Sequence, residues 1–151
     1  MVRGWKARAA AVAAVLWWGS LTTTGVLVVP MLFAYLPSPA LAGQMAARLF
    51  TVQTWIALGC GMFLLMAARS REQPARIDEA RGALGFVLAG VLLALLAEFA
   101  VAPRILAREN MKLWHGIGSG MYLLQWLCAA AVLWKLAIAR DGESLRSGGP
   151  S

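Results

Sequence analysis

Four long runs of hydrophobic residues, separated by short polar segments, dominate the pattern along the chain. Between Arg8 and Arg48 no residue carries a charge, and this interval alone is longer than the roughly 20 apolar residues that cross a bilayer. None of the runs alternates apolar and polar residues as a half-buried strand does, and backbone in lipid must satisfy its hydrogen bonds internally. The pattern predicts four transmembrane helices, at residues 9–33, 49–68, 83–102 and 113–138.

Composition supports this prediction. The 151 residues are 60% hydrophobic and 14% charged, whereas a soluble domain is about 25% charged. Soluble and disordered classes are therefore excluded, and Cys60 and Cys128 are too few for a disulfide scaffold and are interpreted as free core thiols. We predict an all-α integral membrane protein in which residues 1–140 form one four-helix transmembrane bundle and residues 141–151 form a disordered cytoplasmic tail.

Basic residues are distributed unequally between the two ends of the predicted helices. The N-terminus, the second connection and the C-terminal end contribute Arg3, Lys6, Arg8, Arg69, Arg71, Arg76, Arg81, Lys135, Arg140 and Arg146. The first and third connections contribute Arg48, Arg104, Arg108 and Lys112. Because Lys and Arg are retained on the cytoplasmic side, both termini are predicted to be cytoplasmic, in a bacterial inner membrane. The net charge of +7 then reflects topology and contact with anionic lipid rather than nucleic acid.

The first run also has features of a secretory signal. Basic residues precede an apolar stretch, and Ala40-Leu41-Ala42 imitates a small-residue cleavage site. The stretch is longer than the roughly 7–15 apolar residues of a typical signal core, so we interpret it as the first transmembrane helix.

Small residues and a proline predict how the helices pack. Gly116 and Gly120 form a Gly-x-x-x-Gly pair in the fourth helix, a spacing that lets helices approach closely within the bundle, in a homo-oligomer or against another membrane protein. Pro30 follows the threonine run 22–24, which predicts a kink with threonine hydroxyls bonded to nearby carbonyls.

Polar residues inside the predicted spans are the candidate functional groups. Glu98 is the only acidic residue deep in a span, where a charge costs about 2.5–3.5 kcal/mol. His115, the only histidine, stands at a similar depth in the fourth helix and shares a helical face with Ser119 and Tyr122. The predicted outer-leaflet polar cluster comprises Gln53, Glu98, Arg104, His115, Ser119 and Tyr122.

Two roles for this cluster stay open. In a structural role, Glu98 is protonated or paired with Arg104, and His115 bonds a carbonyl. In a functional role, the cluster binds or passes a small cation, a proton or a polar solute. No motif for nucleophilic catalysis or phosphate binding is present, which favours a protein that is not an enzyme over an enzyme.

The sequence requires no cofactor, although two are considered. Met111 and His115 are four residues apart, and thioether plus imidazole can bind Cu(I). Haem would need an axial histidine, and with one histidine the second ligand would come from Met or from another subunit.

Several short segments resemble a known family. They are the segments 17–26, 30–33, 42–44 and 48–50, together with Pro103-Arg104 and Trp114-His115-Gly116. In these segments the chain resembles the bacterial domain-of-unknown-function family 4149, which is related to eukaryotic transmembrane protein 205 and grouped with copper-resistance-protein-D-like bundles. The resemblance implies a four-helix inner-membrane protein of unestablished activity, and the wider group suggests copper handling or haem ligation by histidine.

Overall fold

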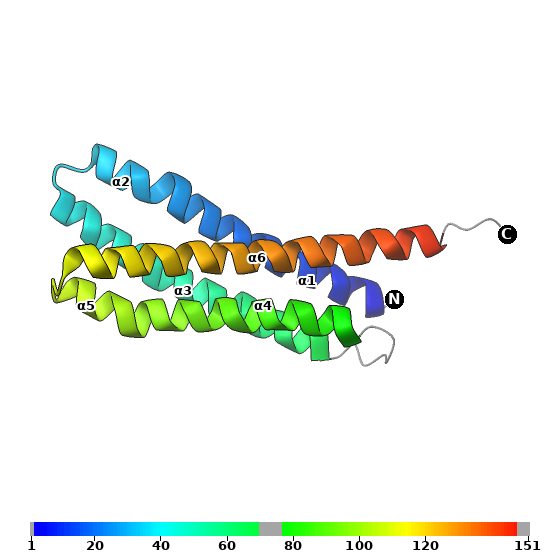
Figure 1. Cartoon of the computed structure of the whole chain (residues 1–151). Helices are drawn as coiled ribbons and strands as arrows, with labels where there is room; N and C mark the ends of the chain where they lie inside the picture. The colour runs from blue at the N-terminus through cyan, green and yellow to red at the C-terminus, as the bar shows by residue number, and fades with distance from the viewer. Residues whose placement is uncertain (1, 70–76, 148–151) are drawn as a thin grey trace.

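The computed structural model describes residues 2–69 and 77–147, which are helical except for two short connections. In chain order, the elements are α1 (Val2–Thr22), η1 (Thr23–Val28), α2 (Val29–Tyr35), α3 (Pro39–Arg69), α4 (Ile77–Leu96), η3 (Ala97–Val101), α5 (Ala102–Leu106) and α6 (Met111–Ser147). The described residues contain no strand. The two η elements are π-helical segments that continue the α-helices on either side. The described chain therefore forms four long rods (Figure 1): the first is α1–η1–α2, the second is α3, the third is α4–η3–α5 and the fourth is α6.

All four rods can cross a membrane by length and composition, which confirms the predicted all-α membrane fold. The apolar stretches are Trp5–Tyr35, Pro39–Ala68, Gly82–Leu106 and Met111–Ile138. Large side chains on their outer surfaces, such as Trp55 and Phe99, are more than half exposed. In a membrane protein such side chains contact lipid, since the bilayer core is as apolar as they are.

The helices are longer than the sequence predicted. α6 continues to Ser147, so residues 141–147, expected in a disordered tail, are helical, and α4 begins at Ile77 rather than at residue 83. Hydropathy marks the part of a helix that fits hydrocarbon, whereas backbone hydrogen bonding continues into polar sequence. Residues 70–76 of the expected loop and residues 148–151 of the tail lie outside the described residues.

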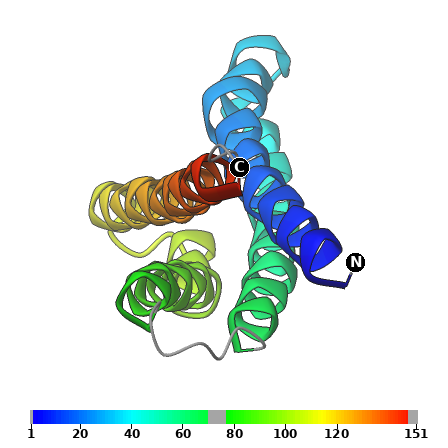
Figure 2. The ribbon, with the colours of Figure 1, turned by 90° about the vertical axis from the view of Figure 1, so that its right-hand side faces the viewer.

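Each rod packs against two others, in the order α1, α3, α4, α6 and back to α1 (Figure 2). The start of α1 and the far end of α6 lie at the same end of the bundle (Figure 1). We call the opposite end, which contains the connections 36–38 and 107–110, the hairpin end. There α2 packs on α3 and α5 packs on α6, and the two pairs diverge (Figure 1).

The core is built from small residues around one large indole. Trp17 is fully buried, and a Cβ added at Gly90 would come within 2.7 Å of its ring. Gly61 in α3 likewise faces Val91 of α4. Glycine at these contacts lets the rods approach closely, which is how membrane helices gain packing energy.

The Gly-x-x-x-Gly pair that the sequence singled out does not take part in these contacts. Gly116 and Gly120 are exposed, and no atom lies within 4 Å of a Cβ built at either position. Within the described part of the bundle, therefore, helices pack closely at glycines such as Gly61 and Gly90, and not at this pair.

Pro30 and Pro103 each follow a π-helical segment. Proline has no N–H and its ring clashes with a preceding carbonyl, so an α-helix cannot continue unchanged through it. Just before each proline, a backbone N–H donates to the carbonyl five residues back. Val29 donates to the carbonyl of Thr24, and Ala102 donates to that of Ala97. The sequence predicted a kink at Pro30, and the structure has the π-helical segment η1 just before this proline; the corresponding segment η3 before Pro103 was not predicted.

Candidate functional site

Glu98 projects from η3 toward α3 and is half-buried. Its carboxylate Oε1 lies 2.8 Å from the Thr51 hydroxyl. This is the only hydrogen bond to the Glu98 side chain within residues 2–69 and 77–147, and no ion pair reaches it there. The acid therefore meets a hydroxyl rather than a basic group.

The Thr51 hydroxyl has a second neighbour, because its Oγ1 also lies 3.3 Å from the carbonyl oxygen of Ala47. A hydroxyl has one hydrogen to donate and lone pairs to accept with. If Glu98 is ionised, Thr51 donates to it; if Glu98 is protonated, the acid donates to Thr51, whose hydrogen turns to Ala47. Both protonation states of Glu98 thus fit the same positions of the heavy atoms.

Gln53 belongs to a different group of contacts on α3. Its side chain is 4% exposed, its Nε2 donates to the Ser20 hydroxyl at 3.0 Å, and its Oε1 accepts from Thr24 at 3.4 Å. Two residues correspond to about 200° around an α-helix, so Gln53 and Thr51 face opposite ways. Gln53 consequently ties α3 to the first rod, away from Glu98.

Tyr122 fastens α6 to the first rod. Its hydroxyl donates to the carbonyl of Leu21 at 2.7 Å, and its ring lies against Gly25, where an added Cβ would come within 2.6 Å. Phe50 meets the same ring edge-on, with centroids 5.4 Å apart. Only glycine fits at position 25 without moving the phenol ring.

Trp126 continues this contact one turn further along α6. Its Nε1 donates to the Thr22 hydroxyl at 2.8 Å, and its ring lies 5.7 Å from that of Trp18. Thr22 in turn donates to the carbonyl of Trp18 at 2.9 Å, the threonine-to-carbonyl bond that the sequence predicted. The predicted face of α6 therefore packs on the first rod at Tyr122 and Trp126.

The same face of α6 becomes exposed toward the hairpin end. His115 and Ser119 are exposed, and within the described residues neither side chain forms a hydrogen bond or an ion pair. The cause is the divergence of α2 and α6, which leaves this part of the face without a partner helix.

Arg104 lies apart from Glu98 at the surface of α5. Its Nη1 donates to the carbonyl of Ala100 at 3.1 Å, and its Cζ lies 4.5 Å from the ring centroid of Trp114. The six residues predicted to form one cluster are therefore dispersed. Glu98 is hydrogen-bonded to Thr51, whereas Gln53 and Tyr122 are hydrogen-bonded to the first rod. Arg104, His115 and Ser119 are at the surface.

Thr51 is the residue that sequence reasoning missed. A threonine in an apolar helix is ordinary, and no spacing within α3 distinguishes it. The one available signal is chemical. An isolated acid such as Glu98 needs a hydrogen-bond partner, and α3 offers two candidate hydroxyls, those of Thr51 and Thr54.

Metal-binding groups are sparse. Within the described residues, no group of three or more His, Cys, Asp or Glu side chains could hold a metal ion. Met111 and His115 are both exposed at the start of α6, whereas Cys60 and Cys128 are buried free thiols.

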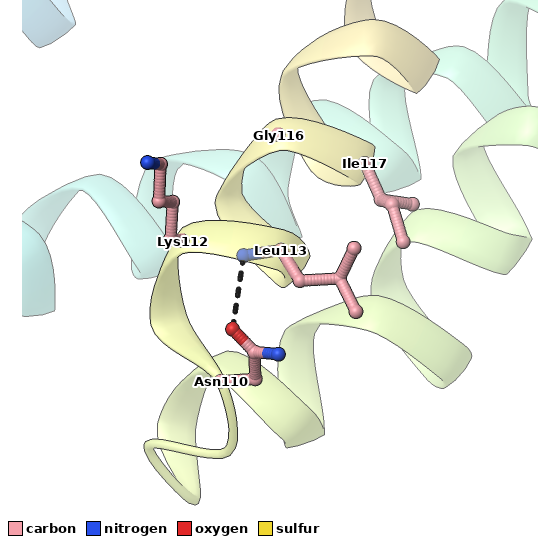
Figure 3. A pocket seen from close by; sticks show the side chains of 5 residues that line it. All are labelled: Asn110, Lys112, Leu113, Gly116 and Ile117. Atoms are coloured by element: carbon pink, nitrogen blue, oxygen red, sulfur yellow. Dashed lines mark hydrogen bonds between the residues drawn. The ribbon is translucent and has the colours of Figure 1, made fainter.

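An open groove lies at the start of α6 (Figure 3). Asn110, Lys112, Leu113, Gly116 and Ile117 line it. The groove is shallow and open on its outer side, and none of the six residues of the predicted polar cluster lines it.

Comparison with known proteins gives one match. A family model described as a domain of unknown function (DUF4149) matches residues 12–113, more than half of the chain. The matched region includes Thr51 and Glu98 and ends just before His115. No curated protein and no solved structure matches the chain.

Proposed function

Because the chain belongs to the DUF4149 family, whose description leaves the activity open, we propose a function from the geometry of its own residues. The protein is a membrane protein that binds, and passes, a proton or a small cation at Glu98. The observation that carries the proposal is the half-buried Glu98 carboxylate, whose one side-chain partner among the described residues is the Thr51 hydroxyl, 2.8 Å away.

The cost of an ionised group in a membrane supports this role. A carboxylate in a membrane span is expensive, and such residues pair with a charge or mark an ion or proton path. Glu98 has no paired cation among the described residues, which leaves its carboxylate available to a proton or a small cation. The Thr51 hydroxyl serves either state, since it can donate to the acid or accept from it.

The backbone hydrogen bonding beside Glu98 is interrupted by Pro103. Pro103 has no N–H, so the carbonyls of Glu98 and Phe99 receive no hydrogen bond from position 103. Carboxylate, hydroxyl and carbonyl oxygens are the ligands that small hard cations prefer. An acid in a π-helical segment also fits the frequent occurrence of such segments at functional sites.

His115 is proposed as the group that exchanges the proton with water. It is the only histidine of the chain and is exposed at the hairpin end. Imidazole changes charge near neutral pH, which suits it to relay protons. Replacing it should slow transport without abolishing it, because water has direct access to that end.

Proteoliposomes test the function. With the purified protein in vesicles that trap a pH-sensitive dye, an imposed gradient should drive proton flux above that of protein-free vesicles. Glu98→Gln should abolish the excess flux and Thr51→Val should reduce it, while Thr54→Val, whose hydroxyl bonds only within α3 to the carbonyl of Phe50, should leave it unchanged. Repeating the assay with a sodium gradient shows whether the transported ion is a proton or a metal cation. If wild type and Glu98→Gln give equal proton flux and equal sodium flux, the proposal is contradicted.

We further propose that the protein resides in a bacterial inner membrane with both termini cytoplasmic. The support is the distribution of ten basic residues against four between the two sides. Cys60 and Cys128 are buried, so an introduced surface cysteine can be labelled selectively. An impermeant maleimide should label Ser38→Cys from outside intact spheroplasts and Lys6→Cys only after lysis, and the reverse pattern would invert the topology.

A further inference from the structure

The groove at the start of α6 has a floor and two unlike walls. Gly116 forms the floor, with no atom within 4 Å of the place where a Cβ would stand. Lys112 stands on one side, and Leu113 and Ile117 stand together on the other (Figure 3). The groove is open and mostly apolar, and an amine stands beside it at the end of a membrane helix, so an acyl chain could lie along it below a charged headgroup.

The head of the groove favours an anion. Lys112 is exposed there, and the Asn110 Oδ1 accepts the N–H of Leu113 at 3.4 Å, which leaves the Asn110 amide Nδ2 as a donor. The start of a long helix carries partial positive charge from its aligned peptide dipoles. Arg108 adds another positive charge to the same connection, where Glu109 is the only acid.

We propose that this groove binds one anionic phospholipid. Its phosphate contacts Lys112 and the Asn110 amide, and one acyl chain lies over Gly116 between Lys112 and the pair Leu113 and Ile117. Lysine is an effective point-charge partner for phosphate, and its long aliphatic stem can lie along the chain while the amine reaches the headgroup.

Charge distinguishes a lipid from a second copy of the protein as the occupant. A symmetric dimer that packed through Gly116 would bring Lys112 of each copy toward the other, because a two-fold interface places the same patch on both sides. The like charges would repel at the boundary of the membrane. A phosphate at the same place attracts the amine.

Photocrosslinking tests the proposal on the full chain in phosphatidylcholine vesicles. A trace of phosphatidylglycerol with a photoactivatable acyl chain should label α6 between Leu113 and Ile117, and unlabelled phosphatidylglycerol should compete better than phosphatidylcholine. Lys112→Gln should lower that preference by about fivefold, the value of one lysine near an anionic surface. Gly116→Leu fills the floor and should remove most of the labelling at this segment.

Matched controls separate the groove from general lipid contact. Gly59→Leu changes another exposed glycine with open space around it, in α3, and Lys6→Gln removes a lysine at the opposite end. Both should leave the labelling and the lipid preference unchanged. Equal competition by the two lipids, or labelling that Gly116→Leu does not reduce, overturns the proposal. Crosslinks between two copies through this segment also overturn it and assign the groove to a dimer.

Discussion

The hydroxyl of Thr51 lies between the carboxylate of Glu98, at 2.8 Å, and the carbonyl of Ala47, at 3.3 Å. One bond crosses from α3 to η3 and the other stays within α3. The single hydrogen of the hydroxyl can serve only one of these acceptors at a time. Any loss of the Glu98 acceptor would therefore free the Thr51 hydroxyl to donate to Ala47, with no movement of a helix required.

This coupling predicts non-additive effects in a double-mutant cycle. Thr51→Val should lower the free energy of unfolding by about 1 kcal/mol, the usual value of one hydrogen bond. In a Glu98→Leu background the same substitution should cost much less, because its partner is already gone. Unfolding in mild detergent, followed by circular dichroism, measures both values. Thr54→Val should cost the same in either background, and equal costs for Thr51→Val would exclude the coupling.

Two buried glutamines predict opposite responses to the same substitution. Gln53 and Gln125 are each 4% exposed, yet Gln53 bonds to Ser20 and Thr24, whereas Gln125 Nε2 has no partner within the described residues. Gln53→Leu should destabilise the fold by about 1–3 kcal/mol, because it removes the bonds of a buried amide to the half-buried Ser20 and Thr24 hydroxyls. Gln125→Leu should be neutral or stabilising, because it removes an unsatisfied donor.

Thermal unfolding of the two glutamine variants in one detergent provides the comparison. Similar losses of stability in both would show that Gln125 has an acceptor of its own.

The contact between Gly90 and Trp17 predicts a compensating pair of substitutions. Gly90→Ala places a methyl group 2.7 Å from the Trp17 ring and should cost about 1–3 kcal/mol, the range for overpacking a core. Trp17→Phe removes the far part of the indole, so the cost of adding Gly90→Ala should fall in that background. Gly59→Ala, in open space, should instead stabilise its helix by up to about 1 kcal/mol. A Gly90→Ala protein as stable as wild type would contradict the close packing.

The number and positions of the rods could be predicted because hydropathy reports directly on transfer into lipid. Helical phase within one rod was also predictable, and Tyr122 and Trp126 pack on the first rod from a common face. Phase does not reveal how two rods diverge, so the exposure of His115 could not be predicted.

Contacts between rods depend on rotation and crossing geometry, which a single sequence does not encode in any spacing. The pairing of Thr51 with Glu98 joins positions 47 residues apart, from α3 to the π-helical segment η3. Glu98 could be singled out by its charge alone, whereas Thr51 is an ordinary residue until its neighbour is known.

The two π-helical segments have a mechanical consequence. Each is followed by a proline that contributes no backbone N–H, so the junctions to α2 and α5 each lack a backbone hydrogen bond that an uninterrupted helix would form. Bending of either rod should concentrate at these two places. Thr24 and Glu98 stand within them, and both are tied to α3. Flexing is therefore expected in α2 and α5 alone, because α3 and α6 continue as uninterrupted helices beside them, and both junctions stay bonded to α3.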